Sequence, residues 1–248
     1  MATNHFFVPA SSVDGEQVRL SAEQAHQVSQ VLRLKPGDAI VVLDDNGAQY
    51  GVTLTSVGPR EAVGRVTDKH PASGEPATQL TLFQSLLARE KFEWVLQKGT
   101  EVGVARFVPV LTERSIMRDR RIEENKLNRW RRIMTEAAEQ SHRGRIPKLE
   151  QAVTFDAAIR QSADFDRCLI AVLSHKAVLL RDALRGIKKG VSVALMIGPE
   201  GGFTPEEVAA AGERGAVPMS LGPRVLRTET AAVVAAALIL YELGEMGP

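Results

Sequence analysis

The feature that most constrains this chain is a strand that runs directly into a glycine-rich loop and then into a helix. It lies in the segment LMIGPEGGFTPEEV, residues 195–208. Thr204 suits a helix N-cap, Pro205 suits the first helical position, and Glu207 completes a capping box with Thr204. The apolar residues before Gly198 therefore predict a strand. A glycine-rich loop beside a helix N-terminus is the ordinary place for a ligand in an α/β protein.

The same arrangement occurs a second time. The strand-like run AVPMSL leads into Gly-Pro-Arg at 222–224, and a helix begins near Thr228. An earlier apolar run, CLIAVL, ends at Ser-His-Lys, residues 174–176, before another helix. Because the carboxyl ends of parallel strands lie at one edge of a sheet, these loops predict a shared pocket. His175 is a loop histidine to which the sequence gives no role.

Two patterns divide the chain at about residue 72. Residues 1–72 contain short alternating strands, with an Asn46-Gly47 turn and a helix opened by Ser21, and predict a small β-barrel or sandwich. The segment HPASGEPATQ is the predicted linker. Residues 78–248 alternate strands with helices, which predicts an α/β parallel sheet flanked by helices. In the first of these helices, Trp94 is predicted to pack in the core.

Composition predicts a cytoplasmic globular protein. The chain has 248 residues, of which 44% are hydrophobic, enough for one large core or two smaller ones. Its N-terminus lacks a signal-peptide pattern, and the longest apolar run, 231–241, is too short to span a bilayer. Cys168 lies inside an apolar run, so we expect a core residue and neither a disulfide nor thiol chemistry.

Charge is unevenly distributed although the formal net charge is only +1. Residues 112–148 contain 11 Lys and Arg against 6 Asp and Glu. A solvated helix face and a surface that binds a polyanion explain such a run equally well. The cluster of Arg143, Arg145 and Lys148 after the helical pattern favours RNA. Within that pattern, a stripe containing Leu127, Trp130 and other residues at helical spacing is predicted to be core.

Several common site motifs are absent from the sequence. There is no GxxxxGK[ST], and GPEGG does not match GxGxxG, which argues against a P-loop and a dinucleotide site. There is no GxSxG. With one cysteine and five scattered histidines, a zinc site is not expected.

Taken together, LMIGPEGGFTPEEV and SLGPRVLRTETA resemble the paired loop signatures of the RsmE family, the 16S rRNA uridine-N3 methyltransferases of the SPOUT superfamily. The resemblance extends over nearly the whole chain. Further matching segments occur in the family's order: HFFV, VLRLKPGD, QKGTEVGV and AAEQSHRGRIP.

This resemblance implies a PUA-like RNA-binding β-barrel over residues 1–72. It also implies a SPOUT methyltransferase domain over residues 78–248, whose parallel sheet contains a trefoil knot. The implied reaction is methylation of N3 of a specific uridine in the decoding region of 16S rRNA, within the small ribosomal subunit. S-adenosylmethionine (SAM) is the implied cofactor, and the chain is expected to be a homodimer without a metal.

The expected SAM site combines backbone groups and apolar side chains of the three loops. Its members are Leu173, Ser174, Ile197, Gly198, Pro199, Glu200, Gly201, Gly202, Ser220, Leu221, Gly222, Val225, Leu226 and Arg227. Loss of the uridine N3 proton requires a base or an anion stabiliser. Glu200 and Glu229 are the candidate bases, and Arg227 could hold the developing anion. Charge compensation at a helix N-terminus is an equally good explanation of Glu229.

The expected RNA contacts are His5, Arg33, Lys35, Arg89, Lys91, Arg114, Arg143 and Arg145. Arg33 and Lys35 at a turn of the barrel, with Arg143 and Arg145 in the other domain, would clamp a folded rRNA segment between the two domains. The chain departs from the family at two of the expected contact regions: His5 replaces an arginine before the aromatic pair, and His26 is followed by Gln27 where paired histidines are common.

Two other functions fit part of this pattern. A ribosome-assembly factor that lost catalysis would keep the barrel and the basic segment, but it would not need both loops. A SPOUT methyltransferase acting on another RNA, such as the ribose of transfer RNA, would need the loops but not this barrel.

Overall fold

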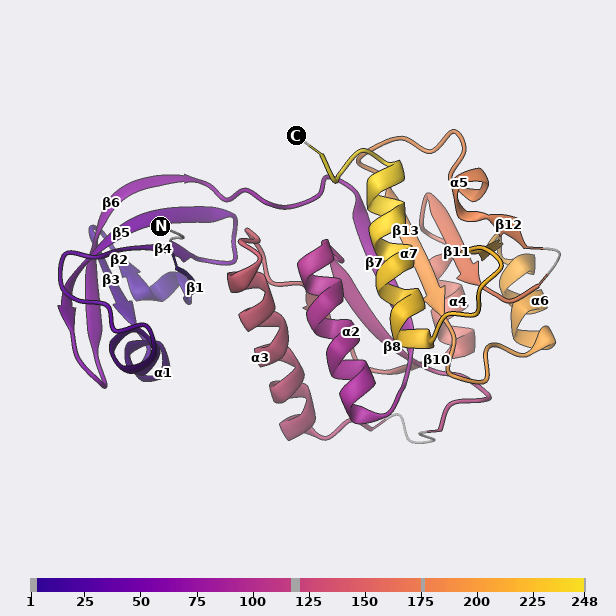
Figure 1. The fold of residues 1–248 in the computed structure, drawn as a ribbon, viewed down its shortest axis with the longest axis horizontal. Helices are drawn as coiled ribbons and strands as arrows, with labels where there is room; N and C mark the ends of the chain where they lie inside the picture. The colour runs from indigo at the N-terminus through magenta and orange to yellow at the C-terminus, as the bar shows by residue number, and fades with distance from the viewer. Residues whose placement is uncertain (1–3, 117–120, 175–176, 248) are drawn as a thin grey trace. The chain divides into compact units, whose positions relative to one another are not determined.

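The computed structural model of the chain describes residues 4–116, 121–174 and 177–247, without the side chain of Arg89. The chain forms two compact units (Figure 1). The first contains residues 1–75 and 135–146, and the second contains residues 76–134 and 147–248. Helix α3 (Glu124–Gln140) supplies residues to both units. The predicted boundaries, 1–72 and 78–248, stay a prediction.

The first unit is built on a six-stranded sheet with the order β1-β4-β5-β6-β3-β2. Its strands are β1 (His5–Phe7), β2 (Val13–Asp14), β3 (Gln17–Leu20), β4 (Ala39–Leu43), β5 (Ala48–Val57) and β6 (Ala62–Pro71). The pairing of β1 with β4 is parallel and the other pairings are antiparallel. This path is open, because no pairing between β1 and β2 closes it within the described residues.

Two local predictions for this unit are confirmed. Asn46 and Gly47 belong to the turn of residues 44–47 that connects β4 to β5, and Gly47 has a positive φ of 106°, which favours glycine. Ser21 caps helix α1 (Ala22–His26) and forms a reciprocal capping box with Gln24. The helix continues as a π-helical turn, η2 (Gln27–Val31).

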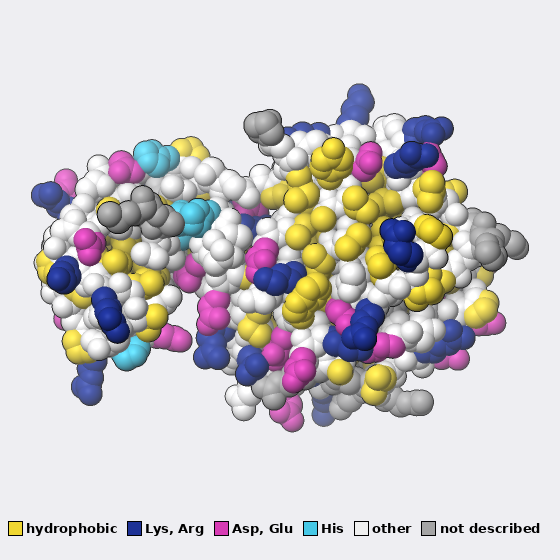
Figure 2. Space-filling view, in the orientation of Figure 1, with side chains coloured by type: hydrophobic (Ala, Val, Ile, Leu, Met, Phe, Trp, Pro, Cys, Tyr) yellow, Lys and Arg dark blue, Asp and Glu magenta, His cyan; other side chains and the backbone are white. Residues whose placement is uncertain are grey.

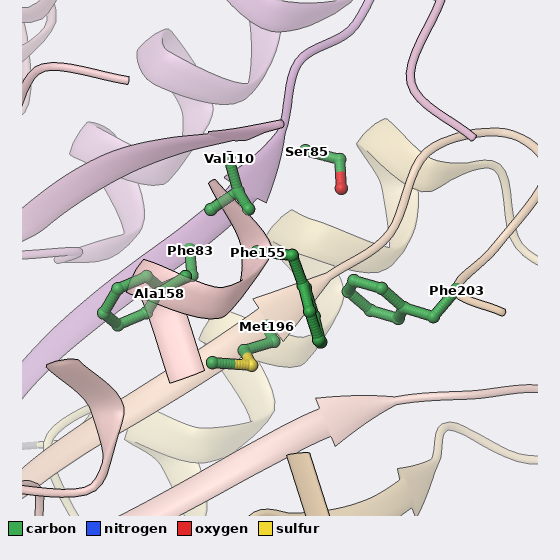
Figure 3. A pocket seen from close by; sticks show the side chains of 7 residues that line it. All are labelled: Phe83, Ser85, Val110, Phe155, Ala158, Met196 and Phe203. Atoms are coloured by element: carbon green, nitrogen blue, oxygen red, sulfur yellow. The ribbon is translucent and has the colours of Figure 1, made fainter. Parts of the chain in front are cut away.

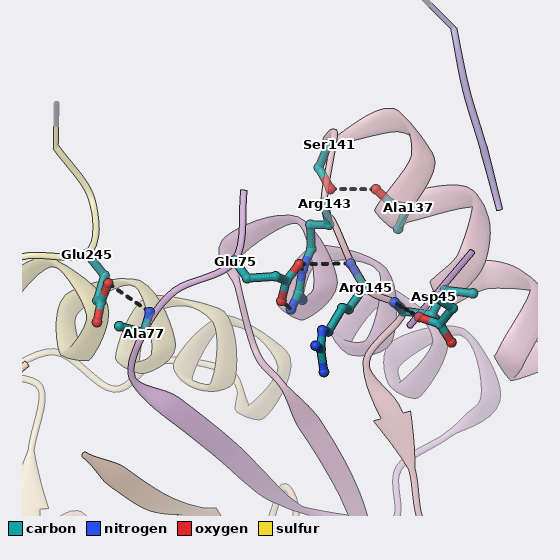
Figure 4. Close-up of polar contacts among 9 residues, drawn as sticks. Asp45, Glu75, Ala77, Ala137, Ser141, Arg143, Arg145 and Glu245 are labelled. Atoms are coloured by element: carbon teal, nitrogen blue, oxygen red, sulfur yellow. Dashed lines mark hydrogen bonds and ion pairs between the residues drawn. The ribbon is translucent and has the colours of Figure 1, made fainter. Parts of the chain in front are cut away.

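The segment after α3 is held to the rest of the first unit by long-range polar contacts (Figure 4). The guanidinium of Arg143 donates from Nε to one carboxylate oxygen of Glu75 at 3.0 Å and from Nη2 to the other at 2.5 Å. The backbone N–H of Ile146 donates to Asp45 at 2.8 Å. Glu75 belongs to the predicted linker, and residues 70–75 of that segment are part of this unit.

The second unit contains a parallel sheet with the order β10-β8-β7-β13-β11-β14-β12, and β9 also pairs with β8. Its strands are β7 (Gln79–Ser85), β8 (Arg106–Leu111), β9 (Lys148–Leu149), β10 (Val153–Thr154), β11 (Arg167–Ala171), β12 (Val178–Leu179), β13 (Ser192–Ile197) and β14 (Val217–Ser220). The predicted α/β parallel sheet is confirmed.

Helices cover both faces of this sheet. They are α2 (Arg89–Val102), α3, α4 (Phe155–Ser162), α5 (Leu180–Ala183), α6 (Pro205–Glu213) and α7 (Thr228–Glu242). Helices α2 and α7 lie side by side against one face (Figure 1). On the other face, Phe155 of α4 and Ala211 of α6 share a core with Met196 of β13. The sheet is thus the middle of three layers.

The prediction for Trp94 is wrong. Phe92, Val95 and Leu96 are buried as the helical pattern predicts, whereas Trp94 is 41% exposed. Residues three and four apart share a helix face, so a residue two positions after Phe92 lies away from the buried stripe. Trp94 is therefore a surface residue of α2.

Two other expectations concern apolar segments. Cys168 is buried in β11, and burial raises the pKa of its thiol, as expected for a core cysteine. Among the helices of the described residues, none combines the length and apolar character needed to cross a membrane.

We predict that Glu139→Gln stabilises the protein above neutral pH. Burial raises the pKa of Glu139 from 4.5 to about 7, although its carboxylate accepts the Phe7 N–H. The folded state therefore binds this proton more tightly than the unfolded state, and stability falls as the pH rises between these values. Glutamine keeps an acceptor for Phe7 and carries no charge. At pH 8 the variant should gain roughly 1 to 3 kcal/mol in unfolding free energy.

Denaturant unfolding at pH 8 and pH 4 measures this difference. The gain should be nearly absent at pH 4, where Glu139 is protonated in both states. Replacement of the exposed Glu213 by Gln is the matched control and should have a much smaller effect. Equal stability of wild type and Glu139→Gln at pH 8 would contradict the prediction.

Candidate functional site

Three loops meet at the carboxyl edge of the parallel sheet. Strand β11 lies between β13 and β14 and pairs with both in parallel. The loops that follow these strands, residues 172–177, 198–203 and 221–227, are therefore neighbours, as the sequence predicts. His175 and Lys176 lie outside the described residues.

The first glycine-rich loop is fixed by the helix that follows it. Thr204 and Glu207 form the predicted capping box at the start of α6. The second carboxylate oxygen of Glu207 accepts the backbone N–H of Glu113 at 2.9 Å. Helix α6 is thereby joined to the segment after β8, and the base of the loop is held from two sides.

Glycine is required at several points of these loops. A Cβ on Gly198 would lie 3.2 Å from the side chain and the backbone nitrogen of Phe203, within the same loop. Gly202 and Gly222 have φ values of 67° and 108°, a region that side chains with a Cβ rarely occupy. The loops therefore have conformations that larger residues would disturb, and their backbone groups stay accessible.

Two cations hold the first loop. Arg114 donates from Nη1 to the carbonyl of Gly201 at 2.8 Å. Lys91 of α2 donates from Nζ to Glu200 at 2.7 Å. This hydrogen bond raises the pKa of Lys91 and lowers the pKa of Glu200. Glu200 is therefore a paired, ionised carboxylate and a weak proton acceptor.

Glu229 differs from Glu200 in its hydrogen bonding, although its charge also raises the pKa of Lys91. It lies in the first turn of α7, where the N-cap residue Arg227 makes no side-chain cap. Its Oε2 is buried and has no hydrogen-bond partner among the described residues. Arg227 is exposed and also lies close enough to influence Lys91. The structure thus brings together all three predicted catalytic residues and adds Lys91.

Apolar side chains project from two of the loops. Leu173 and Val225 are 73% and 76% exposed, although each would gain free energy from being covered. Ile197, by contrast, is buried at the end of β13. Exposed apolar side chains beside open loop backbone fit a flat, partly apolar ligand such as adenine. The roles of the fourteen predicted SAM-site residues stay a prediction.

The predicted RNA-binding residues separate into different groups. Arg33, Lys35 and Arg145 are exposed in the first unit. Arg143 belongs to the same unit but is only 3% exposed and pairs with Glu75, so it is a structural residue. The predicted clamp, which needed Arg33 and Arg143 in different domains, is therefore wrong.

The remaining predicted contacts are at other places. His5 stacks on His142, with ring centroids 4.0 Å apart. Lys91 and Arg114 contact the first loop, as described above. Arg89 is the first residue of α2, and its side chain lies outside the described part of the chain.

Sequence reasoning missed two residues that join the loops. Thr228, buried at the start of α7, donates from Oγ1 to the carbonyl of Gly198 at 2.5 Å. Gln84, buried at the end of β7, donates from Nε2 to Thr228 Oγ1 at 3.4 Å. A glutamine near the end of the mostly apolar strand QLTLFQS was the available signal for Gln84.

A small apolar cavity lies on the α4 side of the sheet (Figure 3). It leaves essentially no space for even a water molecule, whereas typical ligand pockets have roughly 300–1,000 Å³. Its lining residues are Phe83, Ser85, Val110, Phe155, Ala158, Met196 and Phe203. We therefore assign the candidate site to the loops and not to this cavity. The described residues contain no group of three or more side chains suited to binding a metal.

Comparisons with known proteins decide the family. Residues 74–240 match the RNA methyltransferase domain family. The ribosomal RNA small subunit methyltransferase E of Bacillus subtilis is 32% identical over 239 residues, which cover 94% of this chain and 91% of the relative. The chain belongs to the RsmE family. This confirms the resemblance that the loop signatures indicate.

Two further relatives agree with this assignment. The RsmE protein of Synechocystis is 35% identical over 225 residues, covering 90% of this chain and 72% of the relative. The RsmE structure from Neisseria gonorrhoeae, which was solved with SAM bound, has a TM-score of 0.89 and 29% sequence identity. The match covers 99% of this chain and all of that one.

We predict that Lys91→Met raises the pKa of Glu200 towards its ordinary range. The hydrogen bond from Lys91 is the largest cause that lowers this pKa. NMR titration of glutamate-labelled protein measures the shift. Lys98→Met, which removes an ion pair with Glu101 on the same helix, is the matched control and should leave Glu200 unchanged. An unchanged Glu200 pKa in Lys91→Met would show that the pair does not control this carboxylate.

Proposed function

We propose that this protein transfers a methyl group from SAM to N3 of a specific uridine in the decoding region of 16S rRNA, within the small ribosomal subunit. Membership of the RsmE family gives the reaction class, a SAM-dependent methyltransferase of rRNA. The observation that carries the proposal is the set of adjoining glycine-rich loops at one edge of the parallel sheet.

The loops fit SAM in both shape and chemistry. Positive φ angles at Gly202 and Gly222 leave backbone close to the surface, and Leu173 and Val225 offer exposed apolar contacts for adenine. Bound SAM would supply an electrophilic methyl group on its sulfonium. The remaining requirement is a protein group that accepts the N3 proton of uridine as the new N–C bond forms.

We propose that Glu229, and not Glu200, accepts the N3 proton of uridine. Lys91 donates a hydrogen bond to Glu200 and lowers the pKa of Glu200. Glu229 Oε2, by contrast, has no hydrogen-bond partner among the described residues. A buried acceptor without a donor is costly and therefore suits a donor that arrives with the substrate. Arg227, exposed nearby, is placed to stabilise negative charge on the uracil ring or a neighbouring phosphate.

The first unit is assigned to RNA binding. Arg33, Lys35 and Arg145 are exposed cations of this unit, suited to phosphate contacts that position an rRNA segment. We propose that residues 1–72 form a PUA-like barrel and that residues 78–248 form a SPOUT domain with a trefoil knot. The high similarity to the RsmE structure supports both assignments. We also propose that the protein acts in the cytoplasm, where ribosomal subunits are found.

The proposed function predicts 3-methyluridine in small subunits that lack the modification when they are incubated with this protein and SAM. Digestion of the 16S rRNA followed by mass spectrometry identifies the methylated base. Glu229→Gln should lower the rate by about 100-fold or more, because it removes the proton acceptor. Glu200→Gln, the matched control, should retain most of the rate.

Other outcomes separate the alternatives. Binding to small subunits without methyl incorporation would indicate an assembly factor, and a methylated ribose would indicate another type of SPOUT reaction. Wild-type activity of Glu229→Gln would exclude it as the base while leaving the overall function intact.

We further propose that α7 forms a homodimer interface. Its inner side contributes buried residues to the core, and the sequence TETAAVVAAALILYEL has few polar residues for the other side. Leu238 and Tyr241 are exposed on α7, and Trp94 is exposed on the neighbouring helix α2. Figure 2 shows hydrophobic side chains gathered over this face. A second copy of the chain would cover them.

We predict that Leu238→Glu dissociates the dimer, because it would bury an unpaired carboxylate in the interface. Light scattering at micromolar concentration measures the mass in solution. Val31→Glu, a change at an exposed apolar residue of the other unit, is the control and should leave the mass unchanged. A monomeric wild-type protein with full activity would refute the proposed interface.

A further inference from the structure

Two loops of the candidate site are joined through one hydroxyl group. Thr228 follows the loop 221–227, and Gly198 begins the loop after β13. The Thr228 Oγ1 donates to the Gly198 carbonyl at 2.5 Å. Lys91 and Arg114 hold the first loop from other elements, whereas the Thr228 bond couples the conformation of this loop to that of the second.

The hydroxyl of Thr228 has a long-range partner. Thr228 is the first residue of α7, and the N-cap before it, Arg227, makes no side-chain cap. Side-chain capping of the first turn is the role of the N-cap residue, so the position of Thr228 gives its hydroxyl no capping role. It donates instead to the backbone of the neighbouring loop.

Gln84 completes the arrangement from a third element. The Thr228 hydroxyl hydrogen is given to Gly198, so its oxygen can accept the Gln84 Nε2 at 3.4 Å. Gln84 Nε2 also donates to the carbonyl of Ser85 at 3.1 Å, and Gln84 is fully buried. The end of β7, the start of α7 and the end of β13 therefore form one hydrogen-bonded chain.

We propose that Thr228, oriented by Gln84, is a positioning residue that holds the two loops in the spacing required to bind SAM. The inference rests on the proposed function of these loops, and it assigns roles to two residues outside the expected cofactor set. Neither residue needs to touch the cofactor. Their effect is on the backbone of Gly198 and on the position of the second loop.

The test compares Thr228→Val with Thr228→Ser. Valine keeps the shape of threonine and removes the hydroxyl, whereas serine keeps the hydroxyl. Loss of one such bond should weaken SAM binding about five- to tenfold in Thr228→Val, measured by calorimetry on the whole protein. Thr228→Ser should bind within about twofold of wild type, since its hydroxyl can make the same bond.

A matched control separates positioning from general stability. Thr100 is also fully buried, and its Oγ1 donates to a backbone carbonyl, that of Leu96, at 2.7 Å. Thr100→Val therefore removes a comparable bond within α2. The thermal unfolding midpoint of the SAM-free protein should fall in both valine variants, but SAM affinity should fall only in Thr228→Val.

A second variant tests the role of Gln84. Gln84→Met removes the donor to Thr228 at similar length, and it should weaken SAM binding by a smaller factor because the 3.4 Å bond is long. Combined with Thr228→Val, it should add no further loss of affinity, since both act through one hydroxyl.

The possible failures are distinguishable. If wild type does not bind SAM, the proposed function is wrong. If wild type binds SAM and Thr228→Val binds equally well, the function stands and the positioning role is refuted. If Thr228→Ser is as weak as Thr228→Val, the hydroxyl is not the cause, and the role is likewise refuted.

Discussion

The parallel pairing of β11 with both β13 and β14 is the constraint on which the rest of the site depends. Each parallel strand sends its following loop to the same edge of the sheet, and the central strand fixes the distance between the outer two. Several positions of the two glycine-rich loops, including Gly198, Gly202 and Gly222, have no side chain that could hold the loop in place. The sheet therefore fixes where each loop begins, and a small number of polar contacts fix how each loop is oriented.

Those contacts come from elements that are distant in sequence. Lys91 reaches Glu200 from α2, Arg114 reaches Gly201 from the segment after β8, and Thr228 reaches Gly198 from α7. The loop GPEGG is thus supported by charge at its tip and by a neutral hydrogen bond at its base. This division leaves most of the loop backbone accessible, which a pocket for a flat ligand requires.

Local patterns predict the parts of the fold that local physics determines. The capping box of Thr204 and Glu207, the turn at Gly47 and the buried stripe containing Trp130 all depend on residues within a few positions. The parallel pairing of the strands follows from the repeated strand–loop–helix pattern, whereas their order, with β11 between β13 and β14, does not. The family resemblance predicts the reaction, a SAM-dependent methylation of rRNA, and the comparisons confirm the family.

Long-range pairing explains what the sequence could not predict. Arg143 looks like a surface cation, but its partner Glu75 is 68 residues away and brings it into the interior. Lys91 is predicted to contact RNA from its charge, and its ion-pair partner Glu200 is 109 residues away. Nothing in the neighbourhood of either residue indicates these partners, so charge alone gives the wrong environment for Arg143 and no sign of the partner of Lys91.

The first unit is assembled from two stretches of chain separated by residues 76–134. During synthesis, the N-terminal stretch emerges long before the stretch 135–146 that contains Arg143 and Ile146, the partners of Glu75 and Asp45. The carboxylates of Glu75 and Asp45 therefore cannot form these contacts until more than half of the chain has been translated. A typical N-terminal domain can complete its contacts before the next domain is synthesised. This unit can complete its contacts only after residues 76–134 of the second unit have been synthesised, so the two units cannot fold strictly one after the other.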